Sequence, residues 1–483
     1  MRAERWIGAL SCALLVGACG GGGPDTRPDV LLVVVDTLRA DHLSPYGYER
    51  PTAPFLESLA AEGVLCARVT AQAPWTRPSM VSLFAGQYLT DYRDHAIEQA
   101  PSLPELFRAQ GYRTIGISGN QLITSEAGFA RGFEYFDSRP PMPGENESLP
   151  YREADALLES LRVGLRRSLG GAQAHAAQAE RAPVFVYLHL MDPHAPYAER
   201  AAYEGELAGA PAADLARQRA DFERARGSSG SEAVWDELLA ERARYDQEVR
   251  HTDERVRQAV ALCERWGLME DAVVALAADH GEGLWDHPDP RAKDERLDDP
   301  RTYFLGGHGS HLHQELLATP MLWWGPGRIP AGVRIDDPVE NVDLLPTLVQ
   351  LCELPAPRRL DGHSLVDAMD GHELPRSTSH AYMMFASTVL EHETGWKLVE
   401  PTPAGAARGW ETALYDLGED PDELVNVAAD HPDVVTRLRG ALSDWRGRFP
   451  TQSSMARRGA DELRQMEALG YGGLAEEMEE DEE

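Results

Sequence analysis

Three long apolar runs dominate the hydrophobic pattern of the chain, and each is followed at once by polar side chains. The runs cover residues 30–35, 184–191 and 272–278, and the polar groups behind them include Asp36, His194 and Asp279. Apolar runs without alternation are typical of strands that are buried on both faces of a sheet. Ligands of α/β sheets bind beyond the carboxyl ends of such strands. The pattern therefore predicts a sheet with a polar site at one edge.

Helical patterns alternate with these runs, which favours an α/β fold. Residues 200–244 are rich in Ala, Glu and Arg and are broken by a Gly-Ser stretch, so we predict a helical insertion on the surface there. Short segments and one helix after residue 365 predict a smaller C-terminal α+β domain. The other predicted helices cover residues 52–63, 103–110, 245–267, 342–352 and 432–445, and further strands or short segments cover 114–118, 320–324, 379–385, 395–399 and 413–417.

The stretch from residue 72 to 86 predicts a loop that leads into a helix starting near Pro78. Pro74 and Pro78 exclude a helix across the first half, whereas Met80, Leu83 and Phe84 follow at helical spacing. Free amide groups and the helix dipole make such a start an anion site. Thr76 lies just before this helix start, where a hydroxyl is either a helix cap or an activated nucleophile.

Four polar residues from these regions would meet at the sheet edge: Asp36, Thr76, Asp279 and His280. Each alone is a weak signal, since an Asp behind a strand often only caps a loop. Together their oxygen and nitrogen atoms suit a divalent cation, which would lower the pKa of the Thr76 hydroxyl. His194 and His308 are candidates for protonating the leaving oxygen or contacting the bound oxyanion.

The composition narrows the class of partner. The chain of 483 residues has 79 acidic and 46 basic side chains and a net charge of −33, which argues against a nucleic acid as partner. An anionic substrate therefore needs a local positive charge, such as a metal ion or a helix terminus. Beyond residue 19 the cysteines Cys66, Cys263 and Cys352 are few and far apart, so no disulfide framework is implied.

The N-terminus has the pattern of an export signal. Residues 1–18 contain a short apolar run that ends in Val16-Gly17-Ala18, directly before Cys19 and four glycines. This resembles a bacterial lipobox, which predicts an exported protein that is lipid-anchored through Cys19 to a bacterial membrane, on its periplasmic or outer-membrane face. The alternative is an ordinary signal peptide with an incidental cysteine.

The anchor has a direct test. Replacing Cys19 by Ala is expected to release the protein from the membrane fraction of a bacterial host, because the lipid attachment would be lost. Cell fractionation of the two proteins measures this. Equal recovery of both with the membranes would show that another feature holds the protein there.

The predicted domain organisation follows from these segments. We predict a signal peptide over residues 1–18, a glycine-rich tether over 19–28, a catalytic domain over 29–365, an α+β subdomain over 366–450 and an acidic tail over 451–483.

A series of polar motifs follows the predicted elements in order. The motifs are Val33-Val-Val-Asp36, Thr76-Arg-Pro-Ser-Met80, Met191-Asp-Pro-His194, Asp279-His-Gly-Glu282, His308-Gly309, Leu360-Asp-Gly-His363 and Leu414-Tyr-Asp-Leu417. Through them the chain resembles, over most of residues 29–450, the sulfatases of the alkaline phosphatase superfamily. The resemblance implies a large mixed, mostly parallel sheet flanked by helices, a divalent metal (Ca, Mg, Mn or Zn), and an anionic ester substrate, with a glycan or a lipid as candidate carrier. It also implies that Asp36, Asp279 and His280 bind the metal, that Thr76 holds the nucleophile position on the metal, and that His194 and His308 contact the sulfate or phosphate.

The departures from the family pattern concern the nucleophile. Sulfatases of this kind have Cys or Ser there, followed by x-Pro-x-Arg, and oxidise it to formylglycine. Here Thr76 is a secondary alcohol and Met80 replaces the Arg, so formylglycine is not expected. Asn120 stands where the family has a Gly-Lys-Trp motif, and we assign Asn120 and Arg77 to substrate binding. Relatives with a native Thr nucleophile act on phosphorus, which favours phosphate or phosphonate esters without excluding sulfate.

Three functions stay open at this point. The first is a metal-dependent hydrolase of sulfate or phosphate esters that uses Thr76 as nucleophile. The second is a transferase that passes a phosphoryl-linked head group to an envelope glycan or lipid. The third is a non-catalytic protein that binds an anionic glycan, which the intact set of Asp36, Thr76, Asp279 and His280 disfavours.

Overall fold

The computed structural model describes residues 27–88, 101–142, 149–170, 181–203, 205–207, 212–227, 229–289 and 299–448. The predicted signal peptide, most of the tether and the acidic tail lie outside these residues. None of the helices in the described ranges has the length and hydrophobicity that a membrane span requires.

An eight-stranded sheet forms the centre of the fold, in the order β10-β2-β9-β6-β1-β5-β3-β4. Seven strands run parallel to one another, and β9 runs against both of its neighbours. This confirms the predicted mixed, mostly parallel α/β sheet. The strands are β1 (Asp29–Val35), β2 (Val64–Thr70), β3 (Arg113–Ser118), β4 (Tyr135–Asp137), β5 (Val184–Leu190), β6 (Ala272–Ala278), β9 (Ala318–Trp324) and β10 (Val333–Glu340).

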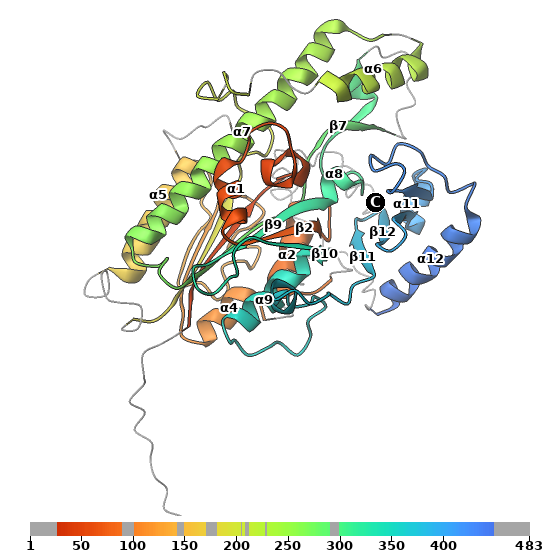
Figure 1. Ribbon diagram of the computed structural model, residues 1–483. Coiled ribbons are helices and arrows are strands. Elements are labelled where there is room, and N and C mark those ends of the chain that lie inside the picture. The colour runs from red at the N-terminus through yellow and green to blue at the C-terminus, as the bar shows by residue number, and fades with distance from the viewer. Residues whose placement is uncertain are drawn as a thin grey trace, which may run out of the picture.

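Helices cover both faces of this sheet (Figure 1). Each central strand is buried over its whole length because its side chains point alternately into two apolar cores. One core is closed by α1 (Pro54–Ala61), α5 (Ala154–Leu169) and α7 (Glu232–Arg265), and the other by α2 (Thr76–Ala85), α4 (Leu103–Ala109), α9 (Leu344–Leu351) and α10 (Val366–Met369).

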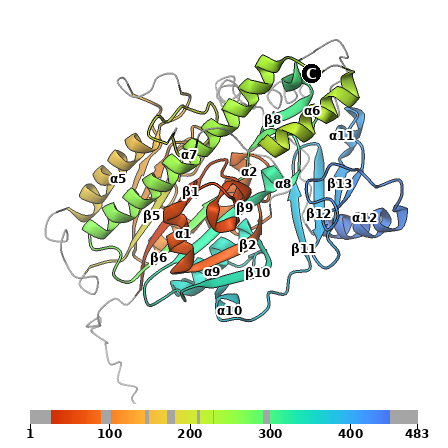
Figure 2. The same ribbon diagram turned by 45° about the horizontal axis from the view of Figure 1, so that its top comes forward.

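The helix boundary predicted at Tyr245 is wrong. The 34-residue helix α7 begins at Glu232, so part of the predicted insertion and the core helix are one continuous element. Its first turns extend past the sheet (Figure 2) and bury Trp235 and Leu238 against Phe222 of α6 (Ala212–Arg226). Because helix formers such as Ala, Glu and Arg fill these turns, nothing in the local sequence ends the helix.

A second, antiparallel sheet of four strands follows, in the order β11-β12-β13-β14. Helix α12 (Pro432–Gly447) packs on it through Leu438, Leu442 and Trp445, which confirms the predicted small C-terminal α+β unit. The strands are β11 (Thr378–Tyr382), β12 (Ala386–Glu391), β13 (Trp396–Pro401) and β14 (Ala413–Asp416), with the short helix α11 (Pro403–Ala407) between the last two. A two-stranded hairpin, β7 (Gly283–Pro288) and β8 (Phe304–Gly307), and the short helix α8 (Gln314–Leu317) lie between the sheets.

A buried ion pair of the C-terminal unit contacts the larger part of the chain through its lysine. Lys397 of β13 donates to the carbonyl of Leu312 at 2.6 Å and lies 2.6 Å from Glu423 Oε1. Both side chains are about 1% exposed, so neither charge can be solvated by water.

Replacing Lys397 by Met is expected to lower the free energy of unfolding by about 3–5 kcal/mol, because the Glu423 carboxylate would be left buried without its partner. Urea unfolding followed by circular dichroism measures the change. The double variant Lys397→Met with Glu423→Gln is the control, and it should recover much of the loss because no unpaired charge remains. A single variant as stable as the wild type would contradict the assigned role of this pair.

Candidate active site

Two buried carboxylates lie side by side at the carboxyl edge of the large sheet. Strands β1 and β6 pair with Val35 opposite Ala278, so the next residues, Asp36 and Asp279, leave the sheet at the same level. Both side chains are fully buried. Asp36 Oδ1 and Asp279 Oδ2 have no hydrogen-bond partner, although a buried carboxylate oxygen ordinarily has one. These two oxygens are therefore free to take a cation.

The backbone turns sharply behind each carboxylate and fixes it. Thr37 has a φ of 54°, which is costly for a β-branched residue. Its amide donates to Asp279 Oδ1 at 3.3 Å and its carbonyl accepts from the Tyr245 hydroxyl at 2.7 Å, so both sides of the strained peptide are held. The amide of His280 donates to the same Asp279 oxygen at 2.8 Å.

The His280 ring is oriented toward the carboxylates. Its Nδ1–H donates to the carbonyl of Gly281 at 2.8 Å, which leaves the lone pair on Nε2. That atom lies 3.4 Å from Asp279 Oδ2 and 3.7 Å from Asp36 Oδ1. The prediction that Asp36, Asp279 and His280 converge is confirmed.

Thr76 faces the same cluster. Its hydroxyl donates to Asp36 Oδ2 at 3.4 Å and lies 3.3 Å from His280 Nε2. The helix α2 begins at Thr76, two residues before the predicted start at Pro78, and Trp75 holds the N-cap position without a side-chain cap bond. The alternative that Thr76 is the helix cap is therefore wrong. Pro78 is tolerated inside the first turn because the amide it lacks would have no partner within the helix.

Asn120, which follows β3, completes this side of the cluster. Its Nδ2 donates to Asp36 Oδ2 at 2.7 Å and to the Thr76 hydroxyl at 3.3 Å, while its Oδ1 accepts from the amide of Leu122. The structure thus places Asn120 beside the candidate nucleophile. Arg77 lies on α2 and is 8% exposed, and its contact with substrate stays a prediction.

Two further imidazoles, His194 and His308, lie next to the carboxylates. Their ring centroids are 4.9 Å apart, and the His308 ring is 4.7 Å from that of His280. The Nδ1–H of His194 donates to the carbonyl of Ala195 at 2.6 Å, and that of His308 donates to Glu282 Oε1 at 2.9 Å. Each ring is thereby fixed through Nδ1.

Burial sets the protonation of the site. It works to raise the pKa of Asp36, yet three neighbouring imidazoles, above all that of His189, pull this pKa below its usual range. Burial and the nearby Asp36 raise the pKa of Asp279 well above its ordinary value, and burial lowers the pKa of His280 to about 3. Without a cation, a proton in this site is therefore favoured on Asp279 over Asp36.

The residues present fit a divalent cation. Carboxylate oxygens without partners, a neutral imidazole nitrogen and a hydroxyl converge in a fully buried site, and such a mixed oxygen and nitrogen set suits a divalent metal. Asp36, His189 and Asp279 offer ligand atoms that all lie within 4.8 Å of one another.

His189 also belongs to this cluster, although the sequence pattern did not identify it as a site residue. This residue lies inside the buried strand β5, opposite Val34 of β1, and its Nε2 is 3.3 Å from Asp36 Oδ2. Its Nδ1 contacts the Tyr187 hydroxyl at 2.9 Å, which fixes the ring. The available signal was a lone imidazole in an otherwise apolar strand, one residue before the strand's end.

Replacing His189 by Gln is expected to weaken divalent-metal binding about 10–100-fold, because the imidazole beside Asp36 would be lost. Isothermal titration with Ca²⁺ and Mn²⁺ gives the dissociation constants. Tyr187→Phe serves as the matched control, since it keeps the imidazole and removes only its hydroxyl partner, so a smaller loss is expected. Affinity unchanged from the wild type in His189→Gln would exclude this role.

Two family profiles match most of the chain. The profile of the family described as Sulfatase matches residues 28–354, and that of N-sulphoglucosamine sulphohydrolase, C-terminal, matches residues 308–447. Human arylsulfatase K is 26% identical over 209 residues, which cover 41% of this chain and 35% of arylsulfatase K, so the match spans about a third of that relative.

Two longer matches cover nearly the whole fold. Delta 4,5-hexuronate-2-O-sulfatase of Bacteroides thetaiotaomicron is 22% identical, with 88% of this chain and 90% of that protein aligned. The crystal structure of phosphonate monoester hydrolase of Agrobacterium radiobacter superposes with a TM-score of 0.63 at 21% identity, over 87% of this chain and 96% of that one.

Proposed function

Because the chain belongs to the sulfatase family, we propose that it is a metal-dependent hydrolase of sulfate or phosphate esters in which Thr76 is the nucleophile. The observation that carries this proposal is the place of the Thr76 hydroxyl, 3.3–3.4 Å from Asp36, His280 and Asn120 in a buried site. A hydroxyl placed only for structure has no need of two carboxylates with free oxygens beside it.

In the proposed reaction, each group of the cluster has a separate role in the attack on the ester. When bound, a divalent cation lowers the pKa of a neighbouring hydroxyl and neutralises the anion under attack. The Thr76 oxygen attacks the sulfur or phosphorus, and its proton has an acceptor within reach in Asp36 Oδ2, 3.4 Å away. Asn120 Nδ2 donates to the attacking oxygen and keeps it directed toward the substrate.

His194 and His308 serve the leaving group. The bond from sulfur or phosphorus to the ester oxygen breaks, and the departing alkoxide takes a proton from one of these rings. Burial lowers the pKa of His308 to about 4 and also lowers that of His194. An anionic ester bound against the rings favours their protonated forms, so the proton is present when the substrate is present. Water then cleaves the ester on Thr76 and releases sulfate or phosphate.

We infer a glycan ester as the natural substrate class. The relative that aligns over most of this chain carries the name of a hexuronate 2-O-sulfatase. The secondary alcohol at Thr76 also fits phosphate or phosphonate esters, a chemistry named for one protein of the same fold.

An assay panel tests the proposed function. Purified protein loaded with Ca²⁺, Mg²⁺, Mn²⁺ or Zn²⁺ is given an aryl sulfate, a phosphate monoester, a phosphate diester and a phosphonate monoester. We expect metal-dependent hydrolysis of at least one class, and none by Thr76→Ala. A folded, metal-loaded protein that cleaves none of the four, yet binds sulfated oligosaccharides, would instead support a non-catalytic glycan binder.

A further inference from the structure

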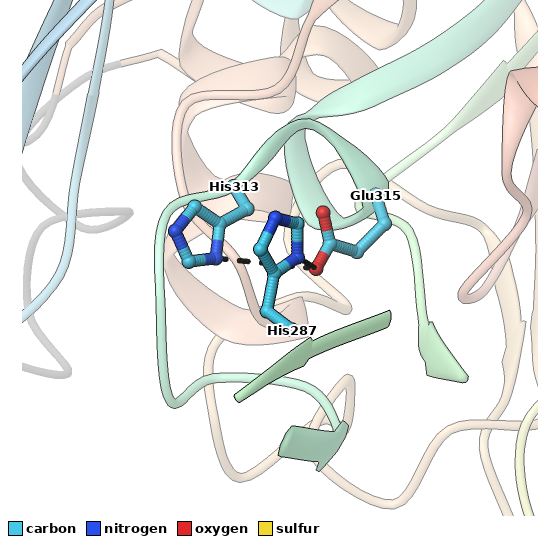
Figure 3. A group of neighbouring side chains, drawn as sticks. All are labelled: His287, His313 and Glu315. Atoms are coloured by element: carbon cyan, nitrogen blue, oxygen red, sulfur yellow. Dashed lines mark hydrogen bonds and ion pairs between the residues drawn. The ribbon is translucent and has the colours of Figure 1, made fainter. Parts of the chain in front are cut away.

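A second cluster of metal-ligating side chains lies between the two sheets and shares no residue with the active site. It consists of His287 in β7, His313 directly before α8, and Glu315 in α8 (Figure 3). One ligand atom of each lies within 4.8 Å of the other two. We propose that these three side chains form a second metal site, for a first-row transition-metal ion such as Zn²⁺.

The backbone holds the three residues together. The hairpin of β7 and β8 is paired at Gly283 and Gly307, and the amides of Gly281 and Glu282 donate to carbonyls of Leu316 and Glu315. A side chain on Gly281 would collide with the Glu315 carbonyl, so the segment that leads into β7 lies in close contact with α8. Backbone hydrogen bonds therefore hold the elements that carry the three residues in a fixed arrangement.

In each of the two imidazoles, one nitrogen faces Glu315 and the other nitrogen contacts a group of the C-terminal unit. His287 Nδ1 lies 2.6 Å from Glu315 Oε1, and its Nε2 donates to the carbonyl of Asp422 at 2.7 Å. His313 Nδ1 lies 4.0 Å from the same oxygen, and its Nε2 is 3.2 Å from the Tyr415 hydroxyl. Figure 3 shows both contacts converging on this carboxylate. Metal-ligating histidines characteristically fix their second nitrogen in this way.

One of these nitrogens is unsatisfied. His313 Nδ1 is buried and has no hydrogen-bond partner, a state that ordinarily costs stability. A cation beside Glu315 Oε1, at the edge of the two stacked rings, would satisfy it and would take the place of the proton that His287 Nδ1 shares with that oxygen. The side chains of His287, His313 and Glu315 are 7%, 14% and 5% exposed, so only a small part of the cluster is open to water.

The ligand types determine the class of metal. Two imidazole nitrogens and one carboxylate oxygen suit Zn²⁺ and its neighbours, whereas Ca²⁺ and Mg²⁺ prefer shells made of oxygen. A third imidazole, His311, stands beside the set, with Nδ1 3.8 Å from Glu315 Oε1. The ion would also tie the catalytic body to the C-terminal unit, since Asp422 and Tyr415 hold the two ligating rings.

Zinc counting on the untagged full-length chain tests the proposal. Protein stripped with a chelator is incubated with Zn²⁺, passed through gel filtration and analysed for bound metal. We expect wild-type protein and the control His372→Asn, which replaces an exposed histidine, to hold one equivalent more than His313→Asn or Glu315→Gln. Equal zinc in wild type and His313→Asn, with both folded by circular dichroism, would overturn the proposal.

A second measurement does not depend on the folding of these variants. Asp279→Asn, which disables the active-site cluster, should still bind one Zn²⁺, and X-ray absorption at the zinc edge should show imidazole ligands. A spectrum with oxygen ligands alone, or a protein without zinc, would exclude the site. Because this experiment uses no substrate, its failure leaves the proposed hydrolase function untouched, and a failed hydrolase assay leaves the zinc count untouched.

Discussion

Thr76→Ala is expected to abolish turnover, with a loss of kcat on the order of 10⁴-fold or more, because no other group takes the place of an attacking hydroxyl. Stability should change little. The hydroxyl makes long contacts of 3.3–3.4 Å, each worth about 1 kcal/mol or less, and Ala suits the first turn of a helix. Initial rates with saturating metal, together with a thermal melt, measure the two effects.

Thr76→Ser is the matched control for this variant. It keeps a hydroxyl at the same position and removes only a methyl group, so it should retain most of the activity that Thr76→Ala loses. If Thr76→Ala instead keeps most of its activity, water attacks the ester directly and Thr76 has only a supporting role.

Asp279→Asn is expected to lower kcat by about 10³-fold or more, since a carboxylate with the proposed role of holding the cation contributes several kcal/mol to the transition state. The amide oxygen of Asn can still accept from the backbone amides of Thr37 and His280, so the fold should persist. Activity measured across a metal titration separates lost affinity from lost chemistry. Full activity at any metal concentration would contradict the assigned ligand role.

The same variant has a distinctive effect on the metal-free protein. Burial and Asp36 raise the pKa of Asp279 above its ordinary value of 3.8, so the folded chain keeps a proton that the unfolded chain loses above that pH. Metal-free wild type should therefore lose stability as the pH rises above about 4, and Asp279→Asn should lack this component. Urea unfolding in the presence of a chelator, at mildly acidic and mildly alkaline pH, measures the difference. If the free energy of unfolding changed with pH in the same way in both proteins, the pKa of Asp279 would not be raised in the metal-free site.

The sequence predicted the main features of this site because strand ends can be read from hydrophobic patterning. Asp36 and Asp279 each follow an uninterrupted apolar run, and parallel pairing of the two strands brings them to one level. The order of the strands was not readable in this way. The antiparallel direction of β9 has no counterpart in its residue pattern, which resembles that of the strands that run parallel to one another.

His189 shows where such reasoning ends. Every residue within a buried strand is expected to contribute to core packing. An imidazole there can be assigned to the site only when the neighbouring strand, and so the carboxylate beside it, is known. His287, His313 and Glu315 were also invisible as a set, because the hairpin that brings His287 to α8 joins distant parts of the chain. Tertiary pairing, not local propensity, creates both clusters.

A covalent ester on Thr76 distinguishes the proposed mechanism from direct attack by water, and an acid quench during turnover can detect it. Protein mixed briefly with substrate is denatured in acid, digested and analysed by mass spectrometry. We expect a phosphoryl or sulfuryl adduct on the peptide that contains Thr76, absent from Thr76→Ala and absent without substrate. An active enzyme that shows no adduct at any quench time, or carries it on another residue, would contradict the account.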